Sequence, residues 1–340
     1  MRSPVEAIVD ATVADVAQLA DADAPLHSTA GIAGLGIALP PKVVSSDAIA
    51  ARIGLADGWI ERRTGIRERR QADPDVRVVD LAAEAALAAL ADADVRADEV
   101  DTVLVATLAS DDFTPNAAPQ VAHAIGATGA GAIDVGAACT GFISGLALGS
   151  ALIESGRAHN VLLVGAEVMS RYTDYDDRAT AGLFGDGAGA ALLAPGGAAT
   201  IGRSVLGSDG AAAPYIVAPR ATGLVQMDGH ETFKRAVRTL ATNAVEAVEA
   251  NDLALDDIDL FVLHQANGRI LSSVREALGV EPDRVLDVIA DVGNTSAASI
   301  PLGLAQARDR GLLRDGSKVL LGAVGAGFTW GTVVIDWRDA

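Results

Sequence analysis

The stretch AIDVGAACTGFISGLAL, residues 132–148, contains Cys139, the only cysteine in the 340 residues. Residues 132–135 predict a short buried strand, residues 136–138 a tight turn of small residues, and residues from Thr140 onward a helix. Glycines at 141, 145 and 149 leave one face of this helix almost without side chains, so that another backbone can pack against it. The sequence therefore places a thiol where a strand turns into a central helix.

A thiol at this position can be catalytic or structural. The unpaired N–H groups and the positive dipole end of a helix N-terminus stabilise a thiolate, which is the nucleophilic form of cysteine. A free cysteine is also among the most often buried residue types and commonly packs as a small apolar side chain. The stretch alone leaves both roles open, and the rest of the chain has to decide between them.

Composition and charge exclude several classes of protein. Forty-five acidic and 26 basic residues give a formal charge of -19, which argues against binding of nucleic acid or of anionic membranes. One cysteine excludes an intrachain disulfide, and the first residues lack the pattern of a signal peptide. Residues 319–335 are apolar, but four glycines divide them, which indicates paired strands and not a membrane helix. These features predict a globular protein of the reducing cytoplasm.

Two parts of the chain resemble each other at a constant offset. Asp101 and Asp259 precede the similar strands TVLVATL and LFVLHQ, and Val161 and Val319 begin VLLVGA and VLLGAV. The differences 259 minus 101 and 319 minus 161 are both 158. Position 139 shifted by 158 is Ala297, which lies in another turn of small residues that leads into a helix. With its alternating strands and helices, the chain predicts two copies of one βαβαβ unit whose equivalent turns face each other.

The second copy supplies two polar candidates for the same site. The strand 260–263 ends in His264, and ligands of α/β sheets gather at the carboxyl ends of strands. Of five histidines, only His264 directly follows a continuous apolar strand. Taken singly, His264 could be a structural residue. The internal repeat, however, predicts that it lies near Cys139 and Asn294, which favours a shared site. The expected organisation is an acidic N-terminal arm at 1–28, a lobe at 29–198 with the nucleophile Cys139, and a lobe at 199–340.

Six motifs, in this order and spacing, resemble the β-ketoacyl-acyl carrier protein synthase III family of condensing enzymes. They are WI at 59–60 with RTGIR at 63–67, the turn around Cys139, FGDGAGA at 184–190, HQAN at 264–267, GNTSAASIP at 293–301 and GAGFTWG at 325–331. The resemblance covers about Gly31 to Trp337. It implies the α/β thiolase fold, in which two duplicated βαβαβ lobes form five layers in the order α-β-α-β-α.

The resemblance also implies the reaction, a decarboxylative Claisen condensation of an acyl-CoA primer with malonyl-acyl carrier protein. Cys139 would accept the acyl group as a thioester, which divides one difficult condensation into two easier steps. His264 and Asn294 would bind the malonyl thioester carbonyl and stabilise the enolate that remains when CO2 leaves. The backbone N–H groups of Cys139 and Ala326 would form the oxyanion hole, although the family usually has glycine where Ala326 stands.

Four residues are implied in binding coenzyme A. Trp59 and Arg178 would hold its adenine, Arg63 would lie near its phosphates, and Asn267 would contact its pantetheine arm. The arginine-rich segment after Trp59 could also be an ordinary solvated loop. Acyl-CoA is then a substrate and no cofactor is implied, and a single cysteine with scattered histidines predicts no metal site.

The acyl pocket is expected to include Phe113, Thr114, Met227 and Phe328. Phe113 and Thr114 lie in a segment that, in the family, crosses a homodimer interface and closes the partner's pocket. Members restricted to short primers carry a bulky aromatic residue at the position of Thr114. The threonine therefore predicts tolerance of longer or branched primers, with Phe113 as the residue that could fill the space instead.

A basic docking patch for the acidic carrier protein is expected on two helical segments, at Lys234, Arg269 and Arg275. On a chain this acidic, a local basic patch is the way to attract an acidic partner, although the three could equally be ordinary solvated side chains.

The main alternative is an acyltransferase of the same fold that moves the acyl group from CoA or carrier protein to a hydroxyl or amine of a small molecule. Such enzymes often carry aspartate as a base where this chain has Asn294. A degradative thiolase would need a second cysteine, and a type III polyketide synthase differs around Asn294 and in the arginine-rich loop. A non-catalytic subunit would lack the nucleophile, so condensation is favoured.

Overall fold

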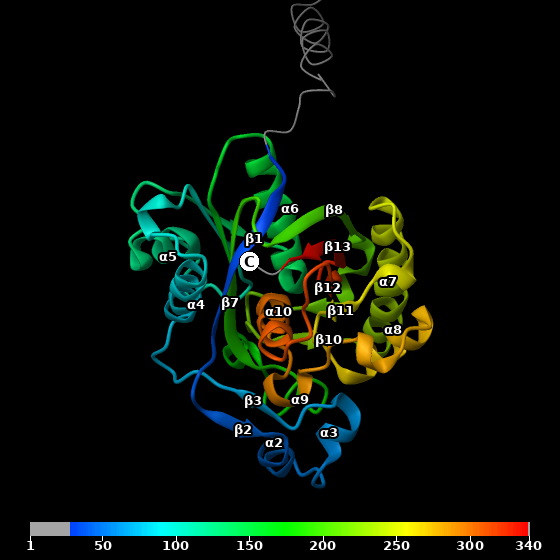
Figure 1. The fold of residues 1–340 in the computed structure, drawn as a ribbon. Coiled ribbons are helices and arrows are strands. Elements are labelled where there is room, and N and C mark those ends of the chain that lie inside the picture. Colours follow the sequence, from blue (N-terminus) through cyan, green and yellow to red (C-terminus); the bar gives the residue numbers. More distant parts are fainter. Residues whose placement is uncertain (1–27, 339–340) are drawn as a thin grey trace, which may run out of the picture.

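The computed structural model describes residues 28–338 (Figure 1). Residues 1–27, nearly all of the expected N-terminal arm, lie outside the described residues. The strands are β1 Ala30–Ala38, β2 Val43–Ser45, β3 Glu68–Arg70, β4 Thr102–Ala106, β5 Gly131–Val135, β6 Val161–Val168, β7 Asp186–Pro195, β8 Ala199–Ser208, β9 Ile216–Val217, β10 Gln226–Met227, β11 Leu260–Leu263, β12 Lys318–Gly325 and β13 Thr329–Trp337.

Helices and single 3-10 turns connect these strands. The helices are α2 Ser46–Arg52, α3 Trp59–Thr64, α4 Val78–Asp92, α5 Ala117–Ile125, α6 Gly141–Glu154, α7 Gly229–Ala250, α8 Gly268–Leu278, α9 Ile289–Val292 and α10 Ser299–Asp309. The 3-10 turns are η1 Ala97–Glu99, η2 Ala138–Thr140, η3 Met169–Tyr172, η4 Gly210–Tyr215, η5 Leu255–Asp257, η6 Pro282–Arg284 and η7 Ser296–Ala298. None of the helices in the described part of the chain has the length and hydrophobicity needed to span a bilayer.

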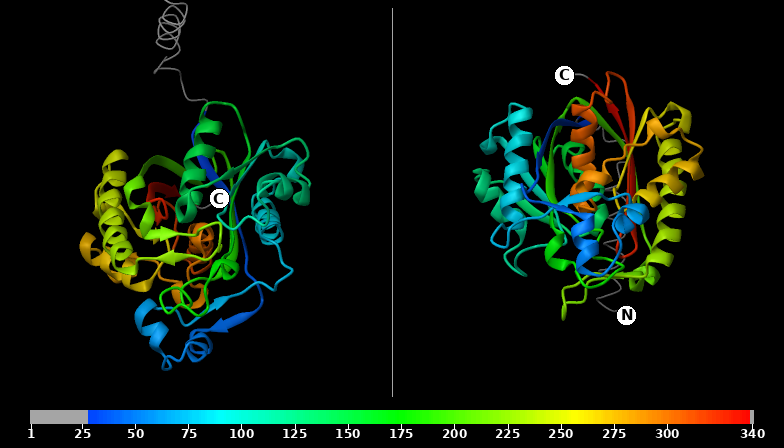
Figure 2. Two further views of the ribbon diagram at one scale, coloured as in Figure 1. Left: turned by 180° about the vertical axis from the view of Figure 1, so that it is seen from behind. Right: turned by 90° about the horizontal axis from the view of Figure 1, so that it is seen from below.

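The described elements form five layers, as the family resemblance implies (Figure 2). Helices α4 and α5 cover the outer face of β1, β7, β6, β4 and β5, and helices α7 and α8 lie outside β11, β12, β13 and β8. Helices α6 and α10 lie between the two groups of strands. One apolar core fills the space around these central helices, and two more cores lie under the outer helices.

The two groups of strands are joined into one nine-stranded sheet in the order β11-β12-β13-β8-β1-β7-β6-β4-β5. Only two residue pairs connect them, Gly31 with Thr200 and Ile32 with Ala199. Strand β8 begins at Ala199, the first residue of the expected second lobe. The apolar stretch 319–335 forms two antiparallel strands, β12 and β13, as predicted.

The internal repeat is present in the structure at the predicted offset. Turns η1 and η5, turns η2 and η7, and helices α6 and α10 each begin 158 residues apart. Ala138 and Ser296, which open the two equivalent turns, both have a positive φ, at 46° and 49°. The Cys139 turn and the Asn294 turn are thus two copies of one local structure, and they pack against each other at the centre of the molecule.

Two expectations about the opening stretch need correction. Strand β5 lies at the edge of the sheet and is largely exposed, with Ile133 at 54%. The glycines of α6 face side chains more than backbone: a Cβ at Gly145 would lie 2.3 Å from a methyl carbon of Leu163 on β6. The glycine spacing indicates that α6 lies close to the sheet, and leucine side chains of the sheet fill the space beside the glycines.

Candidate active site

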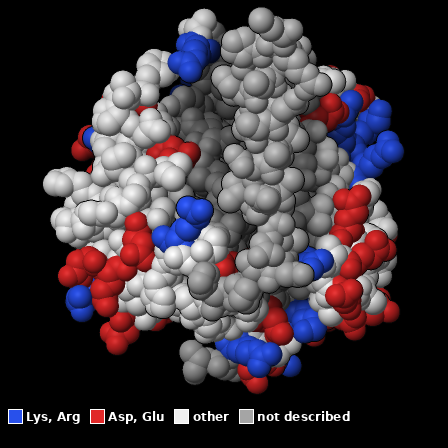
Figure 3. Space-filling view, turned by 90° about the horizontal axis from the view of Figure 1, so that it is seen from above, with Lys and Arg blue, Asp and Glu red and all other residues white. Residues whose placement is uncertain are grey.

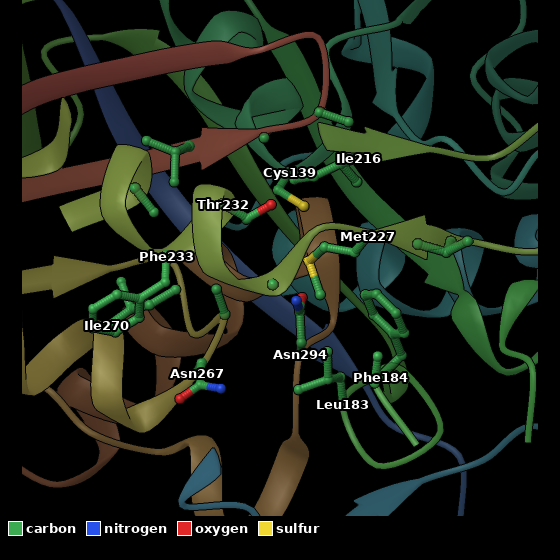
Figure 4. A pocket seen from close by; sticks show the side chains of 18 of the residues that line it. Cys139, Leu183, Phe184, Ile216, Met227, Thr232, Phe233, Asn267, Ile270 and Asn294 are labelled. Atoms are coloured by element: carbon green, nitrogen blue, oxygen red, sulfur yellow. The ribbon is translucent and has the colours of Figure 1, made fainter. Parts of the chain in front are cut away.

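One cavity of about 320 Å³ contains the residues expected to carry the chemistry. Cys139, His264 and Asn294 all line it, and they come from both halves of the chain. Figure 4 shows the Cys139 sulfur and the Asn294 amide directed into this space. The structure therefore brings together the three residues that the motifs single out.

Cys139 is held in turn η2, directly before α6. The Thr140 hydroxyl donates to the Ala137 carbonyl oxygen at 2.6 Å and lies 2.9 Å from the Thr329 hydroxyl. Thr329 Oγ1 in turn donates to the carbonyl oxygen of Ala326 at 3.2 Å. These two hydroxyls connect the Cys139 turn to the loop between β12 and β13, so the two expected backbone donors, at Cys139 and Ala326, belong to one hydrogen-bonded unit.

The space beside the Cys139 N–H group depends on Gly325. A Cβ at Gly325 would lie 2.9 Å from the Cys139 nitrogen and 3.3 Å from the Thr140 nitrogen, where it would block any oxygen bound there. Ala326 is not among the described residues with a positive φ, whereas Gly327 has φ 135°. Alanine is therefore compatible with the backbone at 326, and the departure from the family's usual glycine leaves the donor in place.

The ionisation of Cys139 differs from the expectation. Burial raises the pKa of the Cys139 thiol to about 11, the Ser296 hydroxyl opposes this, and the Glu167 carboxylate adds to it. The helix N-terminus alone predicts the opposite direction, a stabilised thiolate. Removal from water outweighs the helix in this interior, so the resting thiol is protonated at neutral pH and must lose its proton when it reacts.

His264 follows β11 and is 2% exposed. Its backbone N–H donates to the Gly322 carbonyl oxygen at 2.7 Å, which fixes it against β12. Burial lowers the pKa of His264 to about 4, so the imidazole is neutral at physiological pH. A neutral imidazole has one N–H donor and carries no charge that must be removed from water.

Asn294 is held in a defined orientation by its neighbours. Its Oδ1 accepts from the Ser296 N–H at 2.9 Å, and its backbone exchanges hydrogen bonds with Leu183 and Gly185. Because the amide oxygen is engaged, the amide NH2 group faces the cavity, and Asn294 offers donors to whatever binds there.

The residues expected to bind coenzyme A line the same cavity: Trp59, Arg63, Arg178 and Asn267. The guanidinium of Arg63 lies 4.4 Å from the ring centre of Trp59, a cation–π contact at the start of α3. Asn267 caps the N-terminus of α8, because its Oδ1 accepts from the Arg269 N–H at 2.9 Å. This leaves its NH2 group for a ligand.

Of the four residues expected in the acyl pocket, two line the cavity and two do not. Met227 and Phe328 line the cavity. Met227 packs with a small apolar cluster that includes Phe184 and Val225. Thr114 and Phe113 are not among the lining residues of their own chain, and Phe113 is 84% exposed on the surface. A role for this pair in the pocket therefore requires a second copy of the chain.

The expected docking residues lie on α7 and α8 but not all on one face. Arg269 lines the cavity with its guanidinium 5.8 Å from the ring centre of Phe233, and Lys234 pairs with Glu231 at 3.2 Å. Arg275 is six residues further along α8, which places it about 120° around the helix from Arg269. Acidic side chains gather at both margins of the face in Figure 3, with basic ones among them.

Sequence reasoning misses two residues of the site, Glu167 and Ser296. Glu167 lies near the end of β6 and is completely buried. The Ser296 hydroxyl donates to its carboxylate at 2.8 Å and opposes the rise in the Cys139 pKa. The signal was available, because Glu167 follows the apolar run 161–166 just as His264 follows 260–263. Among residues 28–338, no three side chains of His, Cys, Asp or Glu lie together as a metal site would require.

Comparison with known proteins identifies the family. Residues 133–210 match the family described as 3-Oxoacyl-[acyl-carrier-protein (ACP)] synthase III, and residues 248–337 match its C-terminal region. The β-ketoacyl-[acyl-carrier-protein] synthase III of Bacillus pumilus is 41% identical over 312 residues, which are 91% of this chain and 99% of the relative. The enzyme of the same name from Staphylococcus aureus is 40% identical over 311 residues, 90% and 98% of the two chains.

Solved structures agree. The 3-oxoacyl-(acyl carrier protein) synthase III of Pseudomonas aeruginosa superposes with a TM-score of 0.87 at 42% identity, covering 92% of this chain and 99% of that one. A priming β-ketosynthase from a polyketide biosynthetic pathway gives 0.88 at 34% identity, covering 93% and 98%. By sequence, fold and the residues gathered in its cavity, the chain belongs to the β-ketoacyl-[acyl-carrier-protein] synthase III family.

Proposed function

We propose that this chain condenses an acyl-CoA primer with malonyl-acyl carrier protein, releasing CO2 and giving a 3-oxoacyl-acyl carrier protein that starts a fatty acid or polyketide-type chain. One observation carries the proposal: Cys139, His264 and Asn294 line one cavity that also includes the residues expected to bind coenzyme A. The relatives carry the names of enzymes with this activity, and one neighbour is a priming ketosynthase.

In the first half of the reaction, Cys139 attacks the thioester of the primer. The carbonyl oxygen becomes an oxyanion that the N–H groups of Cys139 and Ala326 stabilise, each donor contributing on the order of 3 kcal/mol. Gly325 leaves room for this oxygen beside the Cys139 nitrogen. Coenzyme A leaves, and the acyl group remains on the sulfur.

In the second half, the malonyl thioester carbonyl binds between His264 and Asn294. Loss of CO2 leaves an enolate whose oxygen needs hydrogen-bond donors, and the Asn294 amide and the neutral His264 ring provide them. The enolate carbon then attacks the acyl-cysteine. Because neither donor carries a charge, neither needs a counterion before the enolate forms.

The acyltransferase alternative is not favoured. Acyltransferases of this fold often carry aspartate as a base at position 294, whereas the NH2 group that Asn294 directs into the cavity is a donor with no proton affinity at neutral pH. Acyl-CoA acts as a substrate, and we propose no cofactor or metal for the reaction. A nucleophilic thiol must stay reduced, which supports a cytoplasmic location.

Intact-protein mass spectrometry tests the proposal. The protein is exposed to a panel of acyl-CoAs and then to malonyl-acyl carrier protein, with CO2 measured. We expect an acyl adduct that Cys139→Ala abolishes and that malonyl-acyl carrier protein discharges with CO2 release. An adduct that is never discharged would point to the acyltransferase, and no adduct from any donor would contradict catalysis by Cys139.

The same experiment tests carrier docking. Arg269→Glu reverses a charge at the mouth of the cavity, so we expect discharge by malonyl-acyl carrier protein to slow at least tenfold while acylation by acyl-CoA changes less than threefold. Arg157→Glu is the matched control, because it reverses a charge at an exposed residue that does not line the cavity. An equal loss of both half-reactions in Arg269→Glu would reject the docking role.

We also propose that the chain works as a homodimer joined along β5. This edge strand exposes Ile133 at 54%, the neighbouring helix α6 exposes Leu148 at 50%, and Phe113 is exposed at 84%. An unpaired apolar edge of this kind favours pairing with another strand. In such a dimer Phe113 and Thr114 could reach the partner's pocket, and the small Thr114 side chain supports acceptance of longer or branched primers.

Sedimentation tests the dimer. Ile133→Lys places a charge on the exposed face of β5 without touching the core, so we expect it to shift the protein from dimer to monomer at micromolar concentration. Leu206→Lys, at a residue of β8 that is 48% exposed, is the matched control and should stay dimeric. A monomeric wild-type protein would refute the dimer.

A further inference from the structure

Glu167 is a carboxyl group at the centre of the molecule to which the condensation gives no role. It is 0% exposed. Its Oε2 accepts from the Thr107 hydroxyl and the Leu108 N–H group, each at 3.2 Å. Its Oε1 accepts from the Ser296 hydroxyl at 2.8 Å and from the Ala297 N–H at 3.4 Å. All four partners are neutral, so the carboxylate is held by hydrogen bonds alone.

One of these partners also contacts the nucleophile. The Ser296 hydroxyl, which donates to Glu167, interacts with the Cys139 thiol and favours its ionised form. Ser296 opens turn η7, which packs on turn η2 of Cys139 across the internal repeat. The order of groups is therefore thiol, hydroxyl and carboxylate: the hydroxyl donates to the carboxylate at 2.8 Å, and its turn packs on the turn that holds the thiol.

The Cys139 thiol and the Glu167 carboxyl group both have raised pKa values. Burial raises the pKa of Glu167 to about 7 and that of Cys139 to about 11, and the charge on Glu167 makes the thiol harder to ionise. The other titratable groups nearby are Tyr172 on η3, with Arg171 and Asp111 beyond it, and His264, which lines the cavity. Of these, Tyr172 interacts with Glu167, because the charge on Glu167 contributes to raising the pKa of the Tyr172 hydroxyl. The largest causes of the Glu167 shift are burial, which raises the pKa, and its hydrogen bonds to Ser296, Leu108, Ala297 and Thr107, which lower it.

We propose that Cys139 and Glu167 share one proton through the Ser296 hydroxyl, and that the Glu167 carboxylate holds the thiol proton while Cys139 is acylated. The inference rests on the proposed acylation. The S–H bond of Cys139 breaks as its proton moves to Ser296 Oγ and the Ser296 proton moves to Glu167. The sulfur forms a bond to the primer carbonyl carbon, the bond from that carbon to coenzyme A breaks, and the proton returns through Ser296 to the departing thiolate.

The same contacts would exist if Glu167 only anchored turn η7. The test must therefore measure how the ionisation of Cys139 depends on Glu167. Cys139 is the sole cysteine, and its rate of alkylation by iodoacetamide reports its thiolate alone. If thiol and carboxyl share a proton, the form with thiolate and neutral carboxyl has a constant population once the pair has lost one proton. The alkylation rate of the wild type should then rise to about pH 7, stay level for at least one pH unit, and rise again.

Glu167→Gln keeps the shape of the side chain and removes the proton site, so its alkylation rate should rise about tenfold per pH unit without a level region. A wild type with no level region, or a level region that persists in Glu167→Gln, would overturn the proposal. Because this measurement uses no acyl-CoA, its result does not depend on whether the proposed condensation is correct.

Half-reactions separate a proton role from a structural one. Ser296→Ala breaks the connection but leaves Glu167 its other three hydrogen bonds, and it replaces Glu167→Gln if that variant does not fold. We expect Ser296→Ala to slow acylation by acyl-CoA at pH 8 at least tenfold and malonyl decarboxylation less than threefold. Ser150→Ala, which removes a buried hydroxyl from α6, is the control and should change neither. Equal losses in both half-reactions would assign Glu167 to structure alone.

Discussion

At the scale of single residues, the side chain at position 294 decides what the acyl-cysteine can do. Asn294 accepts the Ser296 N–H with its oxygen and presents its NH2 group to the cavity. In Asn294→Asp one carboxylate oxygen would keep that hydrogen bond and the other would place negative charge where the enolate oxygen forms. We expect decarboxylation of malonyl-acyl carrier protein to fall at least a hundredfold, in line with the loss of an oxyanion donor, as measured by CO2 release.

Acylation of Cys139 by acyl-CoA is the internal control for this variant, because Asn294 is not a donor to the primer oxyanion. It should change less than about fivefold. If Asn294→Asp decarboxylated malonyl-acyl carrier protein at the wild-type rate, the assignment of Asn294 as a donor to the enolate would be wrong.

The motifs of the sequence predicted Cys139, His264 and Asn294, because each stands at a turn or strand end with a recognisable neighbourhood. The net direction of the Cys139 pKa was not predicted. A helix N-terminus is visible in the sequence, but the loss of water around the thiol depends on segments more than 100 residues away, including turn η7. The position of Glu167 after an apolar run was a visible signal, but its hydrogen bond with Ser296 was not, since it joins residues 129 positions apart.

At the scale of elements, helix α6 is fitted to the sheet through its glycines. A Cβ at Gly145 would lie 2.3 Å from Leu163 Cδ1, inside a core without free space. Alanine favours a helix over glycine by about 1 kcal/mol, but overpacking costs about 1–3 kcal/mol. We therefore expect Gly145→Ala to lower the free energy of unfolding by up to about 2 kcal/mol in urea titrations.

A double-mutant cycle identifies the cause. Leu163→Ala alone should destabilise the protein by about 2–5 kcal/mol through the cavity it leaves, and the double variant should lose less than the sum of the two. Gly136→Ala is the matched control, because a Cβ there meets nothing within 4 Å. Additive losses would show that the helix and Leu163 are not coupled through this contact.

The spacing of the glycines predicted a bare helix face, but it did not indicate which side chains would fill it. Strand β5 shows a similar limit. Only Asp134 among residues 131–135 is polar, and the sequence does not show that the sheet ends there. Whether a strand is central or at an edge depends on the order of strands, which is set by the packing of the whole chain.

At the scale of the whole molecule, the repeat of 158 residues predicted two copies of one βαβαβ unit, and the family resemblance implied the five layers that the structure shows. The repeat did not predict that β1 and β8 would join the two halves into one sheet. It also brings two buried titratable groups, His264 and Glu167, to the centre of the protein, one from each copy. Their effects on stability have opposite signs.

Burial lowers the pKa of His264 from 6.5 to about 4, so between these values the folded state binds fewer protons than the unfolded state. The stability associated with neutral His264 is present above pH 6.5 and is lost as the pH falls toward 4. Burial raises the pKa of Glu167 from 4.5 to about 7, so between these values the folded state binds more protons. The stability associated with protonated Glu167 is present below pH 4.5 and is lost as the pH rises toward 7.

Urea unfolding at pH 7.5 and pH 5 measures how the protonation of His264 and of Glu167 changes the free energy of unfolding, when the wild type is compared with variants that lack one of the two groups. Each shift corresponds to roughly 2 kcal/mol between these two pH values. Glu167→Gln keeps only the histidine effect, so on going to pH 5 its unfolding free energy should fall about 2 kcal/mol more than that of the wild type. His264→Gln keeps only the glutamate effect and should fall about 2 kcal/mol less. Parallel pH dependence in all three proteins would mean that neither group titrates in the folded core, and the proton shared by Cys139 and Glu167 would then lose its thermodynamic basis.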